Sequence, residues 1–345
     1  MPGSSPPPVD RYSRQERVAG FGAAGQARLR DAQVMVVGCG ALGTHAAEAL
    51  ARAGIGELRL VDRDIVEWSN LQRQVLFTEA DAAAGTPKAI AAAARLHEIN
   101  RDCRVHAHVA QCGPAFLAGL PARPDVVLDG TDNFATRYLL NDWCAQARVP
   151  WIYAGAVGAE AAAMVVRPGG PCLRCLWPDP PIGSDVGNCE TAGILAPAIA
   201  MVAAFQVAET LKLLVDPAAV TTGVFTADVW RGSYAVLPMR GAADPACATC
   251  GLRQFPALAE APAASVALCG RDAVQVDPGP RTTVDLGELA QRLRGLVDDL
   301  QRTAHLLRFV VDGVRISVFA GGRALLFGVR DPLRARALYD RWIGG

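Results

Sequence analysis

The fold is decided by the stretch QVMVVGCGALG, residues 33–43. Its valine-rich first half, Gln33–Val37, is typical of a strand buried on both faces of a sheet. The second half has the spacing G-x-G-x-x-G, with glycines at Gly38, Gly40 and Gly43. Such glycines allow a tight turn and a close approach of backbone to phosphate at a helix N-terminus. The stretch therefore predicts a strand, a nucleotide-binding loop and a helix, in that order.

Short β-branched runs alternate with Ala/Leu-rich runs on the C-terminal side of this stretch. The alternation predicts an α/β fold, a doubly wound, Rossmann-like and mostly parallel sheet with helices on both faces. Further strands are expected at Glu57–Val61, Arg104–Val109, Asp125–Leu128 and Trp151–Val157, and helices at Thr44–Ala53, Lys88–Asn100 and Asn133–Ala147.

The rest of the chain divides by composition. Residues 1–10 are rich in Pro and Ser and are expected to be disordered; 11–253 form the main domain, 254–266 an Ala/Pro-rich linker, and 267–345 a small α+β domain. Asp312-Gly313 predicts a two-residue hairpin in that small domain. The other expected elements are a buried or interfacial helix Ala192–Leu214, strands Val224–Ala227, Tyr234–Leu237, Leu306–Val311, Val314–Phe319 and Arg323–Val329, and helices Asp285–Gln301 and Pro332–Ile343.

Charge and hydropathy exclude several classes of partner. The 34 basic residues balance 34 acidic ones, so the basic excess of a nucleic-acid-binding protein is missing. The longest apolar run, Ala192–Phe205, is short for a membrane span and contains Pro197. Residues 1–20 have no apolar leader, and ten cysteines in 345 residues are not a disulfide scaffold. We expect a cytoplasmic protein with reduced thiols that binds neither nucleic acid nor membrane.

Asp62 follows the glycine-rich loop by about twenty residues and ends the second strand, where it can accept hydrogen bonds from a ribose. The loop and this acid alone favour a dehydrogenase-type dinucleotide site. They indicate an adenine nucleotide and do not say which one.

The loop after Asp62 favours a triphosphate. It carries Asp64, Asn70, Arg73 and Gln74 where the carboxyl ends of parallel strands line the ligand crevice. Lys88, one of only two lysines, then begins a helix and can meet a phosphate as a point charge. Taken alone, Lys88 is as well explained as a solvated first-turn residue.

A further loop, Thr131-Asp132-Asn133, follows the predicted strand Asp125–Leu128. Asp132 or Asn133 is a plausible N-cap in any protein. Asp132 is also placed to hold Mg²⁺ against phosphate oxygens, since this ion prefers one or two carboxylates together with phosphate. Together, the loops predict a site for a nucleotide with three phosphates.

The cysteines give an independent signal. Cys172-x-x-Cys175 and Cys247-x-x-Cys250 have the spacing of two knuckles of a tetrahedral zinc site. A redox C-x-x-C is the alternative, but neither pair opens a helix after the first strand. We expect inert, structural zinc. Cys189, just ahead of the long apolar helix, is either a reactive thiol with a lowered pKa or an ordinary small residue at a cap.

These residues together resemble the ThiF/MoeB family, the bacterial relatives of ubiquitin-activating enzymes, and lean towards ThiF. The resemblance covers residues 11–253 and includes RYSRQ at 11–15, the glycine-rich loop, Asp62–Gln74, Thr86-Pro87-Lys88, Thr131-Asp132-Asn133 and the four zinc-type cysteines.

The resemblance implies adenylation of a small ubiquitin-like sulfur-carrier protein, ThiS-like or alternatively MoaD-like, at its C-terminal Gly-Gly carboxylate by MgATP. By analogy Asp62 binds ribose, and Asn70, Arg73 and Lys88 bind phosphates. Arg14 would act like an arginine finger on the other subunit of a homodimer. Cys189 would join the carrier covalently during later sulfur transfer, with sulfur supplied by a separate protein such as a cysteine desulfurase.

Two other classes share part of these signals. An NAD-dependent oxidoreductase shares only the glycine-rich loop and Asp62. A non-catalytic module that binds a ubiquitin-like protein would have little reason to keep the full set, namely Arg14, Asn70, Arg73, Lys88 and Asp132.

Overall fold

The computed structural model describes residues 11–180, 192–239, 243–259, 265–267, 273–278 and 283–344. The N-terminal stretch 1–10 and Cys189 lie outside this range. The chain separates into two compact units, Met1–Glu260 and Ala261–Gly345. Each unit has its own sheet, described below by itself.

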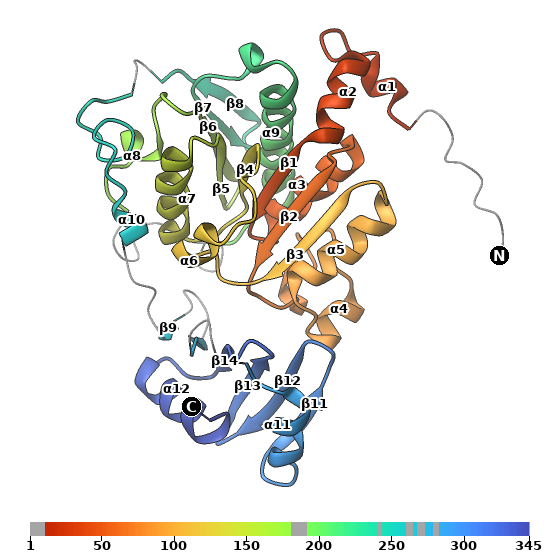
Figure 1. Cartoon of the computed structure of the whole chain (residues 1–345), viewed down its shortest axis with the longest axis vertical. Helices are drawn as coiled ribbons and strands as arrows, with labels where there is room; N and C mark the ends of the chain where they lie inside the picture. The colour runs from red at the N-terminus through yellow and green to blue at the C-terminus, as the bar shows by residue number, and fades with distance from the viewer. Residues whose placement is uncertain are drawn as a thin grey trace, which may run out of the picture. The chain divides into compact units, whose positions relative to one another are not determined.

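The first unit is built on an eight-stranded sheet with the order β3-β2-β1-β4-β5-β6-β7-β8 (Figure 1). The strands β3 to β5 in this order pair in parallel, and the last three pairings are antiparallel. This confirms the α/β, Rossmann-like and mostly parallel sheet. The strands are β1 Gln33–Val37, β2 Glu57–Asp62, β3 Arg104–Val109, β4 Val126–Asp129, β5 Trp151–Val157, β6 Glu160–Val166, β7 Val224–Asp228 and β8 Ser233–Leu237.

Helices cover both faces of the parallel strands, as expected for a doubly wound fold. One face carries α3, α5 and α9, which share a core with β1 and β2. The other face carries α6, α7 and α8 (Figure 1). The helices of this unit are α1 Ser13–Glu16, α2 Gly22–Asp31, α3 Ala41–Ala53, α4 Glu79–Ala84, α5 Lys88–Ile99, α6 Pro114–Ala118, α7 Phe134–Ala147, α8 Leu173–Leu176, α9 Ala196–Val215 and α10 Pro256–Ala259, with 3-10 turns η1 Trp68–Asn70 and η3 Pro217–Ala219.

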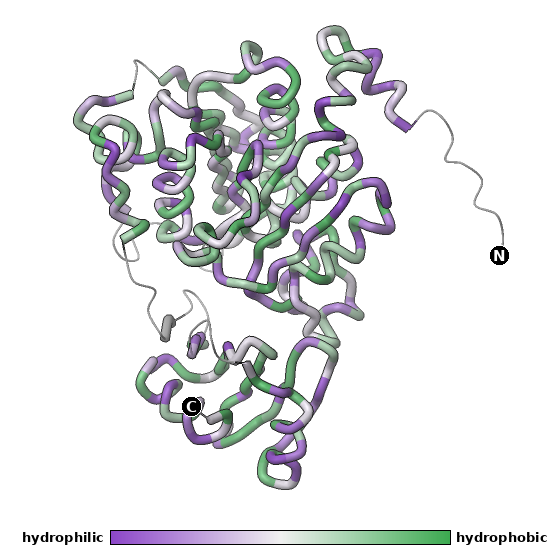
Figure 2. The backbone as a smooth tube through the Cα atoms, viewed as in Figure 1, coloured by the Kyte–Doolittle hydropathy of each residue, from purple (hydrophilic) through white to green (hydrophobic). Residues whose placement is uncertain are grey.

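Helix α9 explains the long apolar run of the sequence. By length and composition it could cross a membrane, but half of its most apolar window is buried inside the structure. Its Gln206 side chain donates to the carbonyls of Asp129 (2.9 Å) and Ile152 (3.0 Å), at the ends of β4 and β5. These contacts identify α9 as a core helix. Its burial explains why much of its length is apolar, as the colouring of Figure 2 shows.

The second lysine, Lys212, lies on α9 and has a structural partner. Its Nζ lies 2.6 Å from Oε1 of Glu209, a carboxylate that is 1% exposed. The same carboxylate accepts from the amide and the hydroxyl of Thr221. Lys212 therefore neutralises a buried acid of its own helix.

The second unit has a six-stranded antiparallel sheet with the order β11-β12-β13-β14-β10-β9. Asp312 (φ 51°) and Gly313 (φ 73°) form the turn between β12 and β13, as a type I′ hairpin requires. Helices α11 and α12 pack on one face of the sheet through a core of Leu, Val and Phe side chains. The elements are β9 Ser265–Ala267, β10 Ala273–Val276, α11 Leu286–Leu293, β11 Asp298–Arg302, β12 Leu306–Val311, β13 Val314–Phe319, β14 Ala324–Phe327 and α12 Pro332–Trp342.

One expectation for this region needs correction. The predicted helix Asp285–Gln301 ends at Leu293, because Gly295 adopts a positive φ of 77° and the chain continues as β11. The stretch 254–266, expected as a linker, contains the division between the two units, together with α10 and the first residues of β9. Helix α10 packs against α7, where the amide of Ala257 donates to Asp142 Oδ2 (2.9 Å).

Candidate nucleotide and zinc sites

The glycine-rich loop is held by direct backbone contact with the loop after β4. A Cβ on Gly43 would lie 1.8 Å from the carbonyl oxygen of Gly38, and one on Gly130 would lie 2.4 Å from the same oxygen. Gly38 itself has a φ of +90°, a backbone conformation that residues with a side chain rarely adopt. Gly40 is different, because its Cβ would meet only ordinary contacts at 3.8 Å or more. Gly38, Gly43 and Gly130 thus allow the glycine-rich loop and the loop after β4 to pack directly against each other. Gly40, at the start of α3, has room where a Cβ would lie.

Asp62 joins the end of β2 to this loop. Its Oδ2 accepts from the amide of Cys39 (2.7 Å), and its Oδ1 accepts from the amide of Asp64 (2.6 Å). The carboxylate is 8% exposed. Burial raises its pKa, against the opposing effect of the Lys88 charge. Asp62 is therefore fixed in the crevice at the position where the sequence placed a ribose ligand.

Lys88 is buried rather than solvated. The residue is 4% exposed, and its Nζ lies 3.6 Å from Asp64 Oδ2. The amide of Lys88 also donates to the carbonyl of Asp64 (2.8 Å), which fixes the first turn of α5 beside the loop after β2. An ammonium group in this position costs desolvation that a phosphate would offset, so the solvated alternative is wrong.

The polar residues between β2 and α4 divide into fixed and available groups. Asn70 is 2% exposed, and its Oδ1 accepts from the amide of Glu67 (3.1 Å). Gln74 is 4% exposed, and its Oε1 is buried without a hydrogen-bond partner among the described residues. The Gln74 Nε2 lies 4.0 Å from the Cβ position of Gly40. Arg73 is half-buried and donates to the carbonyl of Ser69 (2.7 Å). Gln74 thus has polar capacity left beside the glycine-rich loop.

The loop after β4 contributes one exposed carboxylate. Asn133 is the N-cap of α7, since its Oδ1 accepts from the amide of Thr136 (2.8 Å). Thr131 donates its hydroxyl to Asp129 Oδ1 (2.6 Å) and so supports the loop. Asp132 remains exposed at the carboxyl edge of the sheet, with only a 3.4 Å contact from Asn133 Nδ2. Among these residues, Asp132 is the one whose oxygens fit a hard divalent cation.

Sequence reasoning missed Arg137, on the second turn of α7. This buried guanidinium donates to Asp129 Oδ2 (3.2 Å) and to the carbonyls of Thr131 (2.9 Å) and Ala154 (3.2 Å). Its carbon atom Cζ lies 5.2 Å from the ring centroid of Tyr153. Asp129 offsets the cost of burying this cation, although burial raises the pKa of that carboxyl. A signal was present, because an Arg at i+8 from a strand-terminal Asp can return to it from the first turns of a helix.

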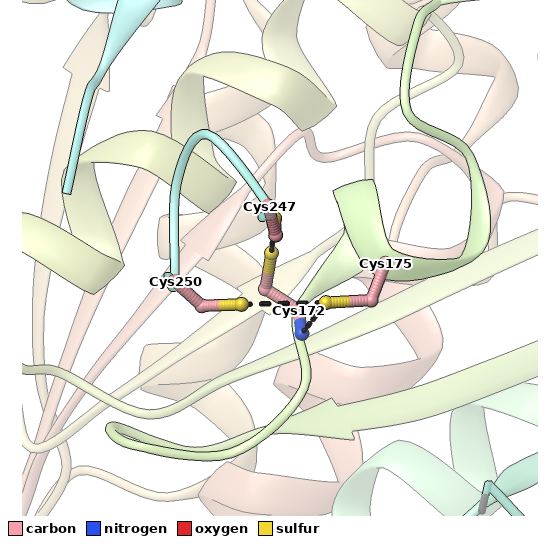
Figure 3. Close-up of side chains that lie close together, drawn as sticks. All are labelled: Cys172, Cys175, Cys247 and Cys250. Atoms are coloured by element: carbon pink, nitrogen blue, oxygen red, sulfur yellow. Dashed lines mark hydrogen bonds between the residues drawn. The ribbon is translucent and has the colours of Figure 1, made fainter. Parts of the chain in front are cut away.

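The four predicted zinc ligands come together although 71 residues separate the two pairs. Figure 3 shows their sulfur atoms pointing towards one another. All four Sγ atoms lie within 4.8 Å of one another, with Cys172–Cys247 at 3.6 Å and Cys175–Cys250 at 3.3 Å. Tetrahedral zinc with bonds of about 2.3 Å needs sulfur atoms about 3.8 Å apart. The cluster therefore fits a Cys₄ zinc site, which is what the spacing predicted.

Two adjacent residues of α7 fix both knuckles. Asn141 accepts from the amide of Leu173 (2.9 Å), in the first knuckle, and its Nδ2 lies 3.6 Å from Cys172 Sγ. Asp142, which is fully buried, accepts from the hydroxyl of Thr249 (2.6 Å) in the second knuckle. Arg174 lies 3.3 Å from the same carboxylate. Helix α7 thus links the zinc ligands to the loop that carries Asp132 at its N-terminus.

Arg14 lies far from the glycine-rich loop of its own chain. The neighbouring Gln15 donates to the carbonyl of Ala53 (2.9 Å), the last residue of α3. The glycine-rich loop is at the other end of that helix, which spans 13 residues and about 20 Å. Arg14 therefore cannot reach the glycine-rich loop of its own chain.

The remaining candidates carry no chemistry of their own. Cys39, Cys103, Cys112 and Cys144 are buried, and burial raises the pKa of Cys112 to about 12. His106 and His108 lie on the edge strand β3, where His108 contacts Phe116 edge to face. No described histidine joins the cysteine cluster.

Comparison with known proteins agrees with this geometry. The model of the ThiF family matches residues 12–249, which is more than half of the chain. The chain belongs to the ThiF family. The resemblance expected from the sequence is thereby confirmed.

Among ThiF family relatives, the sulfur carrier protein ThiS adenylyltransferase of Bacillus subtilis is 39% identical over 336 residues. The match covers 97% of this chain and 99% of that protein, so it includes the second unit. The SAMP-activating enzyme E1 of Haloferax volcanii is 40% identical over 244 residues, 70% of this chain and 89% of that one. E. coli MccB solved with ATP has a TM-score of 0.60 and 26% identity, over 71% of this chain and 75% of that chain.

Proposed function

We propose that this ThiF family chain adenylates the C-terminal Gly-Gly carboxylate of a small ThiS-like sulfur carrier, for later sulfur transfer in thiamine thiazole biosynthesis. The observation that carries the proposal is the burial of Lys88 and Gln74 beside the glycine-rich loop. A dinucleotide site would not need a buried ammonium and a buried amide with spare capacity there, whereas the phosphates of ATP would use both. The similarity to a ThiS adenylyltransferase along almost the whole chain supports the same choice.

The reaction is a substitution at phosphorus. A carboxylate oxygen of the carrier attacks the α-phosphorus of ATP, the bond to the bridging oxygen breaks, and pyrophosphate leaves with the electron pair. The attacking carboxylate is already ionised at neutral pH, so no general base is required. This agrees with the lack of a histidine constellation among the described residues.

The chain's contribution is to position the nucleotide and to offset its charge. Asp62 would accept hydrogen bonds from the ribose, and the open side of Gly40 would admit the phosphates. Asn70, Arg73, Gln74 and Lys88 would bind the phosphates, with Asp64 orienting Lys88 through their 3.6 Å ion pair. Asp132 would hold Mg²⁺; the bound ion supplies charge neutralisation to the phosphate oxygens. Thr131 and Asn133 support the loop that presents Asp132.

The active unit would be a homodimer. Arg14 lies beside the end of α3 that is farther from the glycine-rich loop, and α3 is about 20 Å long, so a second copy would be needed to bring an Arg14 to the phosphates. Helix α9 offers a suitable surface, because Ala200, Ala204 and Ala208 are exposed along one side at intervals of four residues. Small side chains at this spacing let two helices approach closely.

Zinc would be structural. Four thiolates complete its coordination and leave no position for water or substrate. Cys189 would form a covalent link with the carrier only after adenylation, with sulfur delivered by a separate donor such as a cysteine desulfurase. We place the enzyme in the cytoplasm.

The test is ATP–pyrophosphate exchange, run with a ThiS-type carrier and separately with a MoaD-type carrier, each ending in Gly-Gly. We expect exchange with the ThiS-type carrier. Exchange with the MoaD-type carrier alone would keep the chemistry and move the pathway to molybdopterin. If neither carrier supports exchange in a folded sample loaded with zinc, a non-catalytic binding module is favoured. Tight NADH binding without ATP binding would favour an oxidoreductase.

Two variants make the test specific. Asp132→Ala should reduce exchange by about a hundredfold or more, because the phosphate charge loses its metal ligand. Asp102→Asn, an exposed aspartate outside the site, should leave exchange unchanged. Equal activity of Asp132→Ala and Asp102→Asn would contradict the role assigned to Asp132.

A further inference from the structure

A small cationic pocket lies on the segment that carries Arg14. It is lined by Arg11, Ser13, Arg14 and Arg17 and has a volume of about 300 Å³. The sequence singled out Arg14 alone, so the function proposed above leaves Arg11 and Arg17 without a role. All three guanidinium groups are exposed.

Within the part of the chain that the structure describes, no acidic side chain pairs with the charges of the pocket. None of the three arginines forms an ion pair with a described residue. Among the described residues, these guanidinium groups make one hydrogen bond, from Arg11 Nη1 to the carbonyl of Ile99 (3.2 Å), and it leaves the charge of Arg11 unpaired. Three like charges in one small pocket repel each other, and an anion removes that cost. Arginine forks bind phosphate oxygens in pairs, so three of them suit more than one phosphoryl group.

The backbone around the pocket is held on both sides. The hydroxyl of Tyr12 accepts from Asn100 Nδ2 (2.9 Å), which also donates to the carbonyl of Ala51 (2.7 Å). Gln15 Nε2 donates to Gln26 Oε1 (2.8 Å) as well as to the carbonyl of Ala53. Tyr12 and Gln15 alternate with the arginines along the segment. The arginines therefore project from a fixed base, which reduces the entropy cost of binding.

We infer that this pocket binds the pyrophosphate end of the nucleotide held by the other subunit of the dimer, with Arg11 and Arg17 acting beside Arg14. The inference rests on the proposed function. It assigns the β- and γ-phosphoryl groups, which become the leaving pyrophosphate, to three guanidinium groups instead of one. Arg11 and Arg17 would bind pyrophosphate in both directions of the reaction.

The experiment measures the KM for inorganic pyrophosphate in ATP–pyrophosphate exchange, together with the KM for the carrier. Arg17→Ala and Arg11→Ala should each raise the KM for pyrophosphate by about tenfold and leave the KM for the carrier within about twofold. Arg17→Lys should recover part of the loss, because it restores the charge without the fork. Arg95→Ala, an exposed arginine of α5 paired with Glu98, is the matched control and should change neither constant.

The outcomes separate this inference from the proposed function. If the wild-type chain shows no exchange, the proposed function fails first. If the wild-type chain exchanges and Arg17→Ala and Arg11→Ala keep the wild-type KM for pyrophosphate, the pocket is not a pyrophosphate site. An equal rise in both KM values, or a monomeric Arg17→Ala protein in sedimentation, would assign the pocket to dimer assembly and overturn the inference.

Discussion

The amide of Cys39 donates to Oδ2 of Asp62 across 2.7 Å, and this bond ties the glycine-rich loop to the end of β2. The carboxylate that is expected to meet the ribose therefore also shapes the loop that is expected to meet the phosphates. Any change in the charge of Asp62 acts on both.

This double role predicts a pH dependence of ATP binding. Burial raises the pKa of Asp62 above its ordinary value of 3.8, so the carboxyl becomes protonated at a higher pH than an exposed aspartate. Protonation removes an acceptor, so ATP affinity should fall as the pH falls through that raised pKa, approaching tenfold per pH unit below it. Stability has the opposite sign: the ionised form costs more in the fold than in the unfolded chain. Asp62 therefore reduces the free energy of unfolding as pH rises from about 4 through its raised pKa.

The check is isothermal titration with ATP from about pH 4, near the ordinary pKa of an aspartate, up to pH 8, on wild type and on Asp62→Asn. The variant should bind ATP more weakly and lose the pH dependence that Asp62 contributes. A wild-type profile that is flat across this range, or one that Asp62→Asn leaves unchanged, would rule out Asp62 as the titrating ligand.

The glycines of the loop should separate folding from nucleotide binding. Gly43→Ala places a Cβ 1.8 Å from a backbone oxygen and should cost about 3 kcal/mol or more of stability. Gly40→Ala meets no protein atom closer than 3.8 Å, so stability should change by less than about 1 kcal/mol while ATP affinity falls at least about tenfold. Thermal unfolding and ATP titration of both variants test this. Normal ATP binding by Gly40→Ala would place the phosphates elsewhere.

The two lysines should give opposite phenotypes. Lys88→Ala should reduce ATP–pyrophosphate exchange by about a hundredfold, because a charge beside the phosphates is lost. Lys212→Ala should keep exchange and lower the free energy of unfolding by about 1–2 kcal/mol, because Glu209 remains buried without its counter-charge. Exchange assays and urea unfolding of the pair provide the measurement, and a loss of exchange in Lys212→Ala alone would reverse the assignment.

The cysteine cluster predicts one zinc ion per chain. Cys172→Ser should lower the zinc content to near zero and reduce the melting temperature by about 10 °C, because the knuckles lose their clip. Cys112→Ser, which changes a buried cysteine outside the cluster, should keep its zinc. Metal analysis of the purified proteins decides. A Cys172→Ser protein that retains a full zinc equivalent would exclude this site.

The parallel part of the fold could be predicted because local and global signals agree there. Valine-rich runs, short glycine loops and helix caps each point to the same elements. Strand β6 could not be predicted, because its sequence EAAAMVV has no alternation of apolar and polar residues and its alanines favour a helix. It forms a strand because β5 and β7 supply ladder partners on both sides. Helix α11 was predicted too long for a related reason, since one positive-φ glycine outweighed the helical pattern that continued beyond it.

The candidate site divides in the same way. Residue type and spacing were enough to select the four cysteines and the loop residues around Asp62. The division of work within the loops was not visible, because it depends on which polar atoms are already bonded. The side chains of Asn133 and Thr131 form hydrogen bonds that fix the loop, whereas Asp132 and Gln74 have side-chain oxygens that can bind a ligand. The burial of Arg137 also depends on Tyr153 and on the carbonyl of Ala154, which come from a different strand.

The anchoring of both cysteine knuckles by Asn141 and Asp142 has a topological consequence. The chain leaves α7 at Cys175 and returns to the same place at Cys247, so a zinc ion bound by the four cysteines would close residues 176–246 into a loop. A single proteolytic cut within residues 176–246 would leave the fragments fastened to each other at this point. A chelator would remove this link, and the fragments would then be held only by non-covalent contacts such as the β6–β7 pairing and the packing of α9 on β5 and β6.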